Sequence, residues 1–223
     1  MEKVILASAS PRRRDILNKH GVETLILPSD VDETLPEELA DAGPDEVVMY
    51  LAVLKARAVR DMLREDSSTH FSGTHKRSGG GNVRDELPRI IIAADTIVYK
   101  DGIIGKPVDA DDAFRILSSL RNNSHGVYTG VAILDRGEEY KGATCDELAR
   151  AEVFFDLTTV TFRDYPDSEI WRYIEEEPPY DKSGSYAVQS SWSVNIANVD
   201  GDIENVMGLP WHLIEPRLLD NHQ

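Results

Sequence analysis

The stretch Val4-Ile5-Leu6-Ala7-Ser8-Ala9-Ser10-Pro11-Arg12-Arg13-Arg14 joins a short apolar run to a cationic segment that begins with proline. The apolar run is typical of a buried strand. Ser10 suits the N-cap of a following helix, and Pro11 suits its first helical position. The free N–H groups of a helix start attract anions, whereas the helix dipole disfavours cations there. Arginines placed against that preference indicate that a strongly negative ligand binds at this turn, and a phosphate chain is the best candidate.

The composition is that of an ordinary globular protein with an excess of acidic residues. With 223 residues, of which 41% are apolar, the chain is long enough for one large domain or two small lobes. The formal net charge of −16 argues against nonspecific binding to nucleic acid or to an anionic membrane. An anionic ligand must therefore be held by local clustering of Arg and Lys or by a bound cation.

Cysteine content and hydropathy bear on the compartment of the protein. Cys145 is the single cysteine of the sequence, so no internal disulfide can form. No apolar run approaches the roughly 18 residues of a membrane span, and the N-terminal run is too short for a signal peptide. We expect a cytoplasmic protein.

Apolar periodicity and turn residues predict a mixed α/β order along the chain. The segment of about residues 66–88 is polar and rich in glycine, and we interpret it as a flexible insertion. Gly21 is expected to end the first helix. The expected helices are 11–20, 45–64, 109–120, 167–174 and 210–219. The expected strands are the first apolar run, 22–27, the apolar residues 90–94 within 89–99, 127–134, 152–162 and 194–199, with a hairpin turn at 100–102.

Several polar residues fall at the expected ends of these elements. Asp95 follows five apolar residues, and a carboxylate at the end of a buried strand can hold a cation or take a proton from water. It can equally cap the following turn. Lys106, taken alone, is an exposed lysine on a constrained turn. Gln189 could bind a nucleobase edge through its amide or satisfy backbone groups. Acids of the 30–33 loop are more often a solvated face than metal ligands.

A series of short motifs spans nearly the whole chain: Ser8-Ala9-Ser10-Pro11-Arg12-Arg13, Val31-Asp32-Glu33, Lys55-Ala56-Arg57-Ala58, Ala94-Asp95-Thr96, Gly105-Lys106-Pro107, Asp181-Lys182-Ser183-Gly184-Ser185-Tyr186 with Gln189, and Met207-Gly208-Leu209-Pro210. Together, and in this order, they resemble the Maf family of nucleoside triphosphate pyrophosphatases. The Ala-Asp-Thr form is similar to the branch that acts on dTTP and UTP.

The resemblance implies a single domain over residues 1–223, in which helices flank a mixed central sheet and a cleft separates two lobes. That fold is similar to the inosine triphosphate pyrophosphatases. The implied reaction is hydrolysis of dTTP and UTP to the monophosphate and pyrophosphate, with Mg²⁺ or Mn²⁺ as cofactor. The implied partner is the nucleoside triphosphate, without nucleic acid or membrane. A homodimer is compatible with the resemblance, because the family is often dimeric.

The resemblance also assigns roles to individual positions. Residues 142–150 look extended relative to the family, and Ser190 replaces a glycine, which could narrow the base pocket. By the resemblance, the catalytic residues are Asp95, Lys106 and Lys55, the metal ligands are Glu33 and Asp95, and the substrate-binding residues are Ser8, Arg12, Arg13, Thr96 and Gln189.

Two other functions stay open from the sequence. One is a nucleotide-binding regulator of cell division with little turnover, and the other is a pyrophosphatase of the same fold that prefers purines. The presence of Asp95 together with the basic residues favours catalysis, because a protein that only binds nucleotides needs the cations but not the base.

Overall fold

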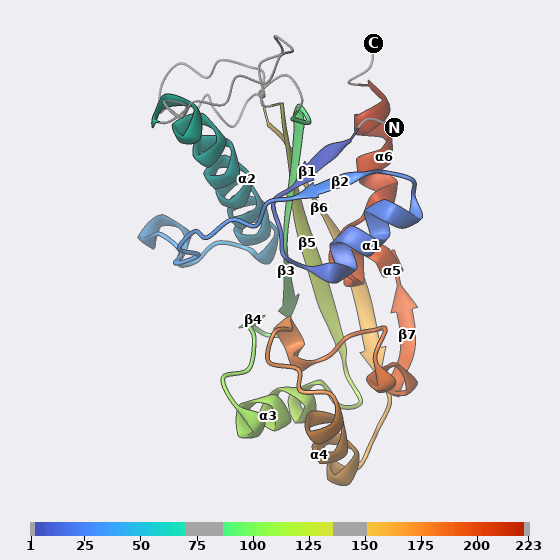
Figure 1. The fold of residues 1–223 in the computed structure, drawn as a ribbon. Helices are drawn as coiled ribbons and strands as arrows, with labels where there is room; N and C mark the ends of the chain where they lie inside the picture. Colours follow the sequence, from blue (N-terminus) through green and yellow to red (C-terminus); the bar gives the residue numbers. More distant parts are fainter. Residues whose placement is uncertain (1–2, 70–86, 136–150, 221–223) are drawn as a thin grey trace.

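The computed structural model describes residues 3–69, 87–135 and 151–220, and its centre is one mixed β-sheet (Figure 1). The strands lie in the order β2-β1-β3-β5-β6-β7, with β4 paired to β3. β1 runs parallel to β2 and β3, whereas the other described strand pairs are antiparallel. The strands are β1 Val4–Leu6, β2 Thr24–Ile26, β3 Ile90–Tyr99, β4 Ile103–Ile104, β5 Ser124–Asp135, β6 Glu152–Phe162 and β7 Ile196–Asp200.

Helices cover both faces of this sheet. In Figure 1, α2 lies on one face, α1, α5 and α6 lie on the other, and α3 and α4 gather at the far end of the long strands. The helices are α1 Pro11–Lys19, α2 Pro44–Thr69, α3 Ala110–Leu120, α4 Asp167–Glu176, α5 Ile203–Val206 and α6 Trp211–Asp220, with short 3₁₀ turns η1 Glu37–Leu39, η4 Ser183–Ser185 and η5 Ser191–Asn195.

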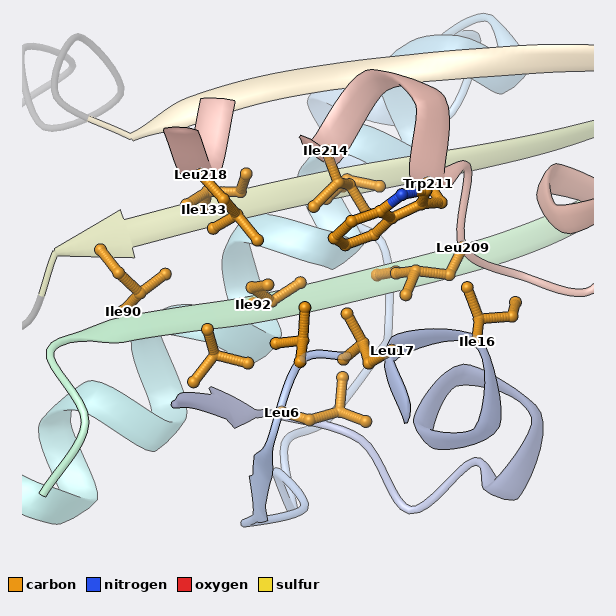
Figure 2. Packing of buried hydrophobic residues seen from close by; sticks show 14 residues of the cluster. Leu6, Ile16, Leu17, Ile90, Ile92, Ile133, Leu209, Trp211, Ile214 and Leu218 are labelled. Atoms are coloured by element: carbon orange, nitrogen blue, oxygen red, sulfur yellow. The ribbon is translucent and has the colours of Figure 1, made fainter. Parts of the chain in front are cut away.

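Strand β3 supplies core residues to both layers, because successive side chains of a strand point to opposite faces. Ile91 packs with the buried residues under α2, whereas Ile92 packs against α1 and α6. Figure 2 shows the second layer, where Leu17 of α1 and Trp211 and Ile214 of α6 lie over Ile92. Burial of each such side chain stabilises the fold by roughly 1.5–3 kcal/mol. The long central strand is therefore a rigid base for polar groups placed further along it.

The expected α/β class, with helices flanking a mixed sheet, is confirmed. Pro11 begins α1 as expected, and Gly21 follows its end with a φ of +75°. Ser10 occupies the N-cap position, but its side chain makes no capping hydrogen bond. Its backbone N–H donates instead to Ser8 Oγ, at 3.2 Å.

Element boundaries differ from the sequence expectations at several places. Helix α2 continues to Thr69, so the first residues of the expected insertion at 66–88 are helical. Helix α5, with four residues, was not expected at all. Residues 70–86 of the expected insertion and the whole 142–150 segment, with Cys145, lie outside the described residues. Within the described ranges, no helix has the length and apolarity that a membrane crossing requires.

Candidate active site

A pocket opens where β1 leaves the sheet. β1 pairs with β3 at Ile5 and Leu6 only, whereas β3 continues to Tyr99. The chain turns at this point into α1, so the edge of β3 beyond Ile92 is free of a parallel neighbour. A cavity of about 390 Å³ lies here, which is in the range of small-molecule sites. Its polar and charged lining residues include Ser8, Ser10, Arg12, Arg13, Lys55, Asp95, Thr96, Lys106, Asp181, Lys182 and Ser183.

The charge of this pocket is opposite to that of the whole chain. Five lining residues are cationic and two, Asp95 and Asp181, are anionic, which leaves three net positive charges in a protein of net charge −16. The cations are Arg12, Arg13, Lys55, Lys106 and Lys182. Local clustering of cations thus overcomes the overall negative field, as the composition required for an anionic ligand.

Asp95 lies in the middle of β3, not at the strand end where the sequence placed it. The strand continues because Thr96 and the residues after it pair with β5 as far as Tyr99. Asp95 nevertheless stands at an open edge, because the shorter neighbour β1 has already ended. The position of the pocket is therefore determined by where β1 ends, and Asp95 lines the pocket from the open edge of β3.

Lys55 of α2 joins two carboxylates on one side of the pocket. Its Nζ lies 2.5 Å from Asp95 Oδ1 and 3.1 Å from Glu33 Oε1. The side chains of Lys55 and Asp95 are only 11% and 12% exposed, whereas that of Glu33 is 47% exposed. The Asp95 carboxylate, at the inner end of the pocket, is thus paired with the Lys55 ammonium of helix α2, which packs on one face of the sheet.

The same geometry bears on a divalent metal. The oxygens of Glu33 and Asp95 converge on one cation position, which the Lys55 ammonium takes. Two carboxylate oxygens beside a phosphate-sized pocket are the hard donors that Mg²⁺ or Mn²⁺ prefers. The two carboxylates fit such an ion in place of the Lys55 ammonium that now lies between them. A second group with metal-ligand chemistry, Asp156, Asp202 and His212, occurs in the described part of the chain, but these three residues do not line the pocket.

Arg13 occupies the other face of β3. Its Nε donates to Gly208 O at 2.8 Å, its Nη1 to Ser8 Oγ at 3.1 Å and its Nη2 to Thr96 Oγ1 at 3.1 Å. Burial lowers the pKa of Arg13 from its ordinary value, and the nearby charge of Asp95 opposes that effect. The guanidinium is thus fixed by three partners from separate parts of the chain.

Gly208 is required at its position by this contact. Its φ is +106°, and a Cβ there would lie 3.2 Å from Thr96 Oγ1 and 3.3 Å from Arg13 Nε. Any other residue would be strained in its backbone and would push against the arginine. The glycine of the Met207-Gly208-Leu209-Pro210 motif therefore lets the backbone approach Arg13 closely.

The three consecutive arginines do not act together. Arg13 lies in the pocket, and Arg12 lies at its mouth, with Nη1 3.9 Å from Asp181 Oδ2. Arg14 is exposed and pairs with Asp15, so the expectation that all three mark one anion site is wrong for this residue. Consecutive helical residues lie about 100° apart, and three of them cannot share one face.

The loop around η4 closes the far side of the pocket. Lys182 contacts Asp181 at 2.5 Å, and Ser183 Oγ donates to Thr96 O at 3.1 Å. Lys106 is exposed and lines the pocket from the neighbouring turn. The N–H of Gly184 donates to Gly105 O and ties the two loops together. Lys182 had no role in the sequence expectations, although it stands in one of the quoted motifs.

Gln189 and Ser190 lie outside the pocket lining. Gln189 is exposed, and its Nε2 donates to Met207 Sδ at 3.3 Å. Met207 lines the pocket, so the Gln189 amide lies next to the pocket wall but is not part of it. Ser190 Oγ donates to Ala187 O and accepts from Trp192 N. The Ser190 hydroxymethyl is therefore held inside its own loop, away from the wall that it was expected to narrow.

Comparison with known proteins agrees with this arrangement. Residues 3–220 match the family model described as Maf-like protein. The chain is 37% identical over 211 residues to a dTTP/UTP pyrophosphatase of Caldicellulosiruptor bescii, covering 94% of this chain and 90% of the relative. It is 36% identical over 211 residues to a dTTP/UTP pyrophosphatase of Bacillus cereus, covering 94% and 91%.

A search of solved structures finds a nucleoside-triphosphatase, also described as a dITP/XTP pyrophosphatase, from Mycobacterium abscessus. The match has 16% sequence identity and a TM-score of 0.37, and it covers 74% of this chain and 76% of the other. The family assignment therefore rests on the family model and the sequence relatives. By both, this chain belongs to the Maf family.

Proposed function

We propose that the protein is a nucleoside triphosphate pyrophosphatase that converts dTTP and UTP to the monophosphate and pyrophosphate, in a single domain. The observation that carries the proposal is a pocket with net positive charge and the paired carboxylate of Asp95 at its inner end. The names of the relatives, dTTP/UTP pyrophosphatases with about the same length, support this choice of substrate.

Binding of the triphosphate falls to the side chains around Arg13. Ser8 Oγ accepts hydrogen bonds from Arg13 Nη1 and from the N–H of Ser10. Since a hydroxyl has two lone pairs and one proton, the Ser8 proton points away from both donors and is available to a phosphate oxygen. Lys106 and Arg12 add positive charge at the mouth of the pocket. Such donors stabilise the charge that develops on the leaving pyrophosphate.

In this proposal, Asp95 receives the proton of the attacking water. In the proposed reaction the water oxygen bonds to the α-phosphorus, the bond from that phosphorus to the bridging oxygen breaks, and pyrophosphate leaves. Lys55 holds the Asp95 carboxylate in place through an ion pair of 2.5 Å. When bound to Glu33 and Asp95, a divalent cation would supply charge neutralisation of the triphosphate and a lowered pKa of bound water.

Release of pyrophosphate from a panel of nucleoside triphosphates, with and without Mg²⁺, tests the proposal. We expect turnover of dTTP and UTP that is lost when the metal is chelated. Tight binding of the nucleotides without any release of pyrophosphate would contradict the enzymatic proposal and favour a nucleotide-binding regulator. Faster turnover of purine triphosphates would contradict the assigned substrates.

A further inference from the structure

Thr129 is a buried hydroxyl residue directly behind the pocket. It lies in β5 opposite Thr96 of β3, and it is 0% exposed, so it cannot touch a ligand. Its Oγ1 lies 3.0 Å from Thr96 Oγ1 and 2.9 Å from the backbone oxygen of Asn205. The sequence marks it only as a threonine in an apolar strand, and no motif includes it.

The direction of these hydrogen bonds follows from the number of protons. A carbonyl oxygen can only accept, so Thr129 gives its single proton to Asn205 O. Thr129 Oγ1 must then accept from Thr96, which uses the single proton of the Thr96 hydroxyl. Thr96 Oγ1 in turn accepts from Arg13 Nη2. The result is a one-way chain from Arg13 through both threonines to the Asn205 carbonyl.

This chain determines what the pocket offers to a ligand. Thr96 presents lone pairs and no proton, so it can hold the arginine but cannot donate to a nucleobase or a phosphate. Arg13 has five N–H groups, and Gly208, Ser8 and Thr96 accept from three of them. Among the contacts of the described residues, one N–H on each Nη nitrogen remains, and each can donate to a phosphate oxygen.

We propose that Thr129 is a positioning residue that fixes the Thr96 hydroxyl as an acceptor and thereby orients the Arg13 fork toward the triphosphate. The proposal rests on the proposed function, in which Arg13 binds phosphate. It assigns to Thr96 the role of holding the arginine, in place of direct contact with the base. Thr129→Val keeps the shape of the side chain but removes the acceptor of the Thr96 proton. Thr96 Oγ1 can still accept from Arg13 Nη2, but its hydroxyl is no longer fixed as an acceptor, so the Arg13 fork is held less firmly.

Thr158 provides a matched control. It is also a buried threonine, in β6, and its Oγ1 donates to the carbonyl of Asp202 at 2.9 Å, but it makes no hydrogen bond to Thr96 or Arg13. Thr158→Val removes this hydrogen bond and the one that Thr158 Oγ1 accepts from Asn205 Nδ2 at 3.0 Å. Asn205 Nδ2 keeps its bond to Val127 O at 3.0 Å, so the Asn205 carbonyl that ends the chain to Arg13 stays in place. Thr129→Ser keeps the hydroxyl and serves as the rescue variant.

The test is a double-mutant cycle on binding of a non-hydrolysable UTP analogue, in which a methylene replaces the α,β-bridging oxygen, measured by calorimetry with Mg²⁺. In the wild-type background, Thr129→Val is expected to raise Kd about tenfold, whereas Thr158→Val and Thr129→Ser change it less than about twofold. In an Arg13→Lys background, which lacks the fork, Thr129→Val is expected to add less than about twofold.

Each result has a separate meaning. If Thr129→Val raised Kd by the same factor in the wild-type and the Arg13→Lys backgrounds, the positioning role would be overturned. The same holds if Thr158→Val raised Kd as much as Thr129→Val does. Either result would leave Thr129 with a structural role only. Binding of the analogue that is unaffected by Arg13→Lys would instead overturn the proposed phosphate site. Unfolding curves of all variants, recorded in the same buffer, establish that the binding temperature lies below every transition.

Discussion

Lys55 and Asp95 form a nearly buried ion pair between α2 and β3, with Nζ 2.5 Å from Oδ1. The pair joins a helix on one face of the sheet to the strand that carries the pocket. It fixes the position of the carboxylate without closing the pocket, which both residues line. The stability of the fold and the catalytic rate are therefore both expected to depend on this ion pair, and substitutions at its two residues can separate the two effects.

Asp95→Asn is expected to lower kcat by roughly 10²–10⁴-fold, because it removes a proton acceptor and a metal ligand. The fold should persist, since Lys55 keeps its contact with Glu33 at 3.1 Å. Steady-state pyrophosphate release at saturating Mg²⁺, together with a circular dichroism spectrum, checks both parts. A folded variant with the kcat of the wild type would exclude Asp95 from the reaction.

Lys55→Met is expected to destabilise the protein by about 3 kcal/mol, because it leaves the buried Asp95 carboxylate without its cation. Adding Asp95→Asn to Lys55→Met removes that charge and should recover most of the loss. Urea unfolding of the two single variants and the double variant measures this. If the two substitutions were simply additive in the free energy of unfolding, the ion pair would not be the source of the effect.

The residues of the pocket could be found from sequence motifs, but their geometry could not. Arg13 and Arg14 are neighbours of the same type, and only the rotation of α1 decides that the first enters the pocket and the second pairs with Asp15. Asp95 looked like a strand end because five apolar residues precede it. The pairing of the next residues with β5, which extends the strand, is a long-range contact with no local signal.

Residues that act behind the pocket were harder still to find. Thr129 is separated in sequence from both Thr96 and Asn205, and only the register of β3 and β5 and the position of α5 bring them together. Ser190 shows the opposite error. Its replacement of a family glycine suggested that it narrows the base pocket, whereas its hydroxyl contacts Ala187 and Trp192 of its own loop and Tyr173 of α4. Residue type and local sequence identify candidate residues, whereas strand pairing and helix packing determine which of these residues come into contact.

His125 gives the fold a dependence on pH. It is 3% exposed, its Nε2 lies 2.7 Å from the hydroxyl of Tyr186, and burial, with a smaller effect of the Lys100 charge, lowers its pKa from 6.5 to about 4. The unfolded chain takes up this proton near pH 6.5 and the native state only near pH 4. Stability is therefore lost as the pH falls through that window.

Between pH 7 and pH 5, His125 alone should lower the free energy of unfolding by about 2 kcal/mol. His125→Gln keeps an amide that can bond to the Tyr186 hydroxyl but does not titrate, so its stability should fall less over the same interval. Urea unfolding of both proteins at the two pH values gives the difference. Parallel losses in the wild type and the variant would show that other groups cause the acid sensitivity.

The pocket is expected to distinguish thymine and uracil from cytosine by the hydrogen-bonding edge of the base. Thymine and uracil share a carbonyl–NH–carbonyl edge, which a glutamine amide can match by donating to a carbonyl and accepting from the ring N–H. Cytosine presents an amino group and an unprotonated ring nitrogen at the same place. A mispaired polar group costs about 1–3 kcal/mol when it is buried, and Gln189 is exposed, so we expect the lower end of that range, a preference of UTP and dTTP over CTP of about tenfold.

Gln189 is the residue that we expect to make this distinction. Gln189 lies beside Met207, which lines the pocket, and within the described part of the chain its Nε2 donates to the sulfur of Met207, at 3.3 Å. Sulfur is a weak acceptor, so the amide can turn toward a base in the pocket at little cost. Gln189→Glu offers acceptors alone and should shift the ratio of kcat/KM for UTP and CTP toward CTP by about tenfold or more. Gln189→Met, a side chain of similar length without the amide, should lower kcat/KM for UTP without favouring CTP. An unchanged ratio in both variants would show that the base edge is selected by other residues.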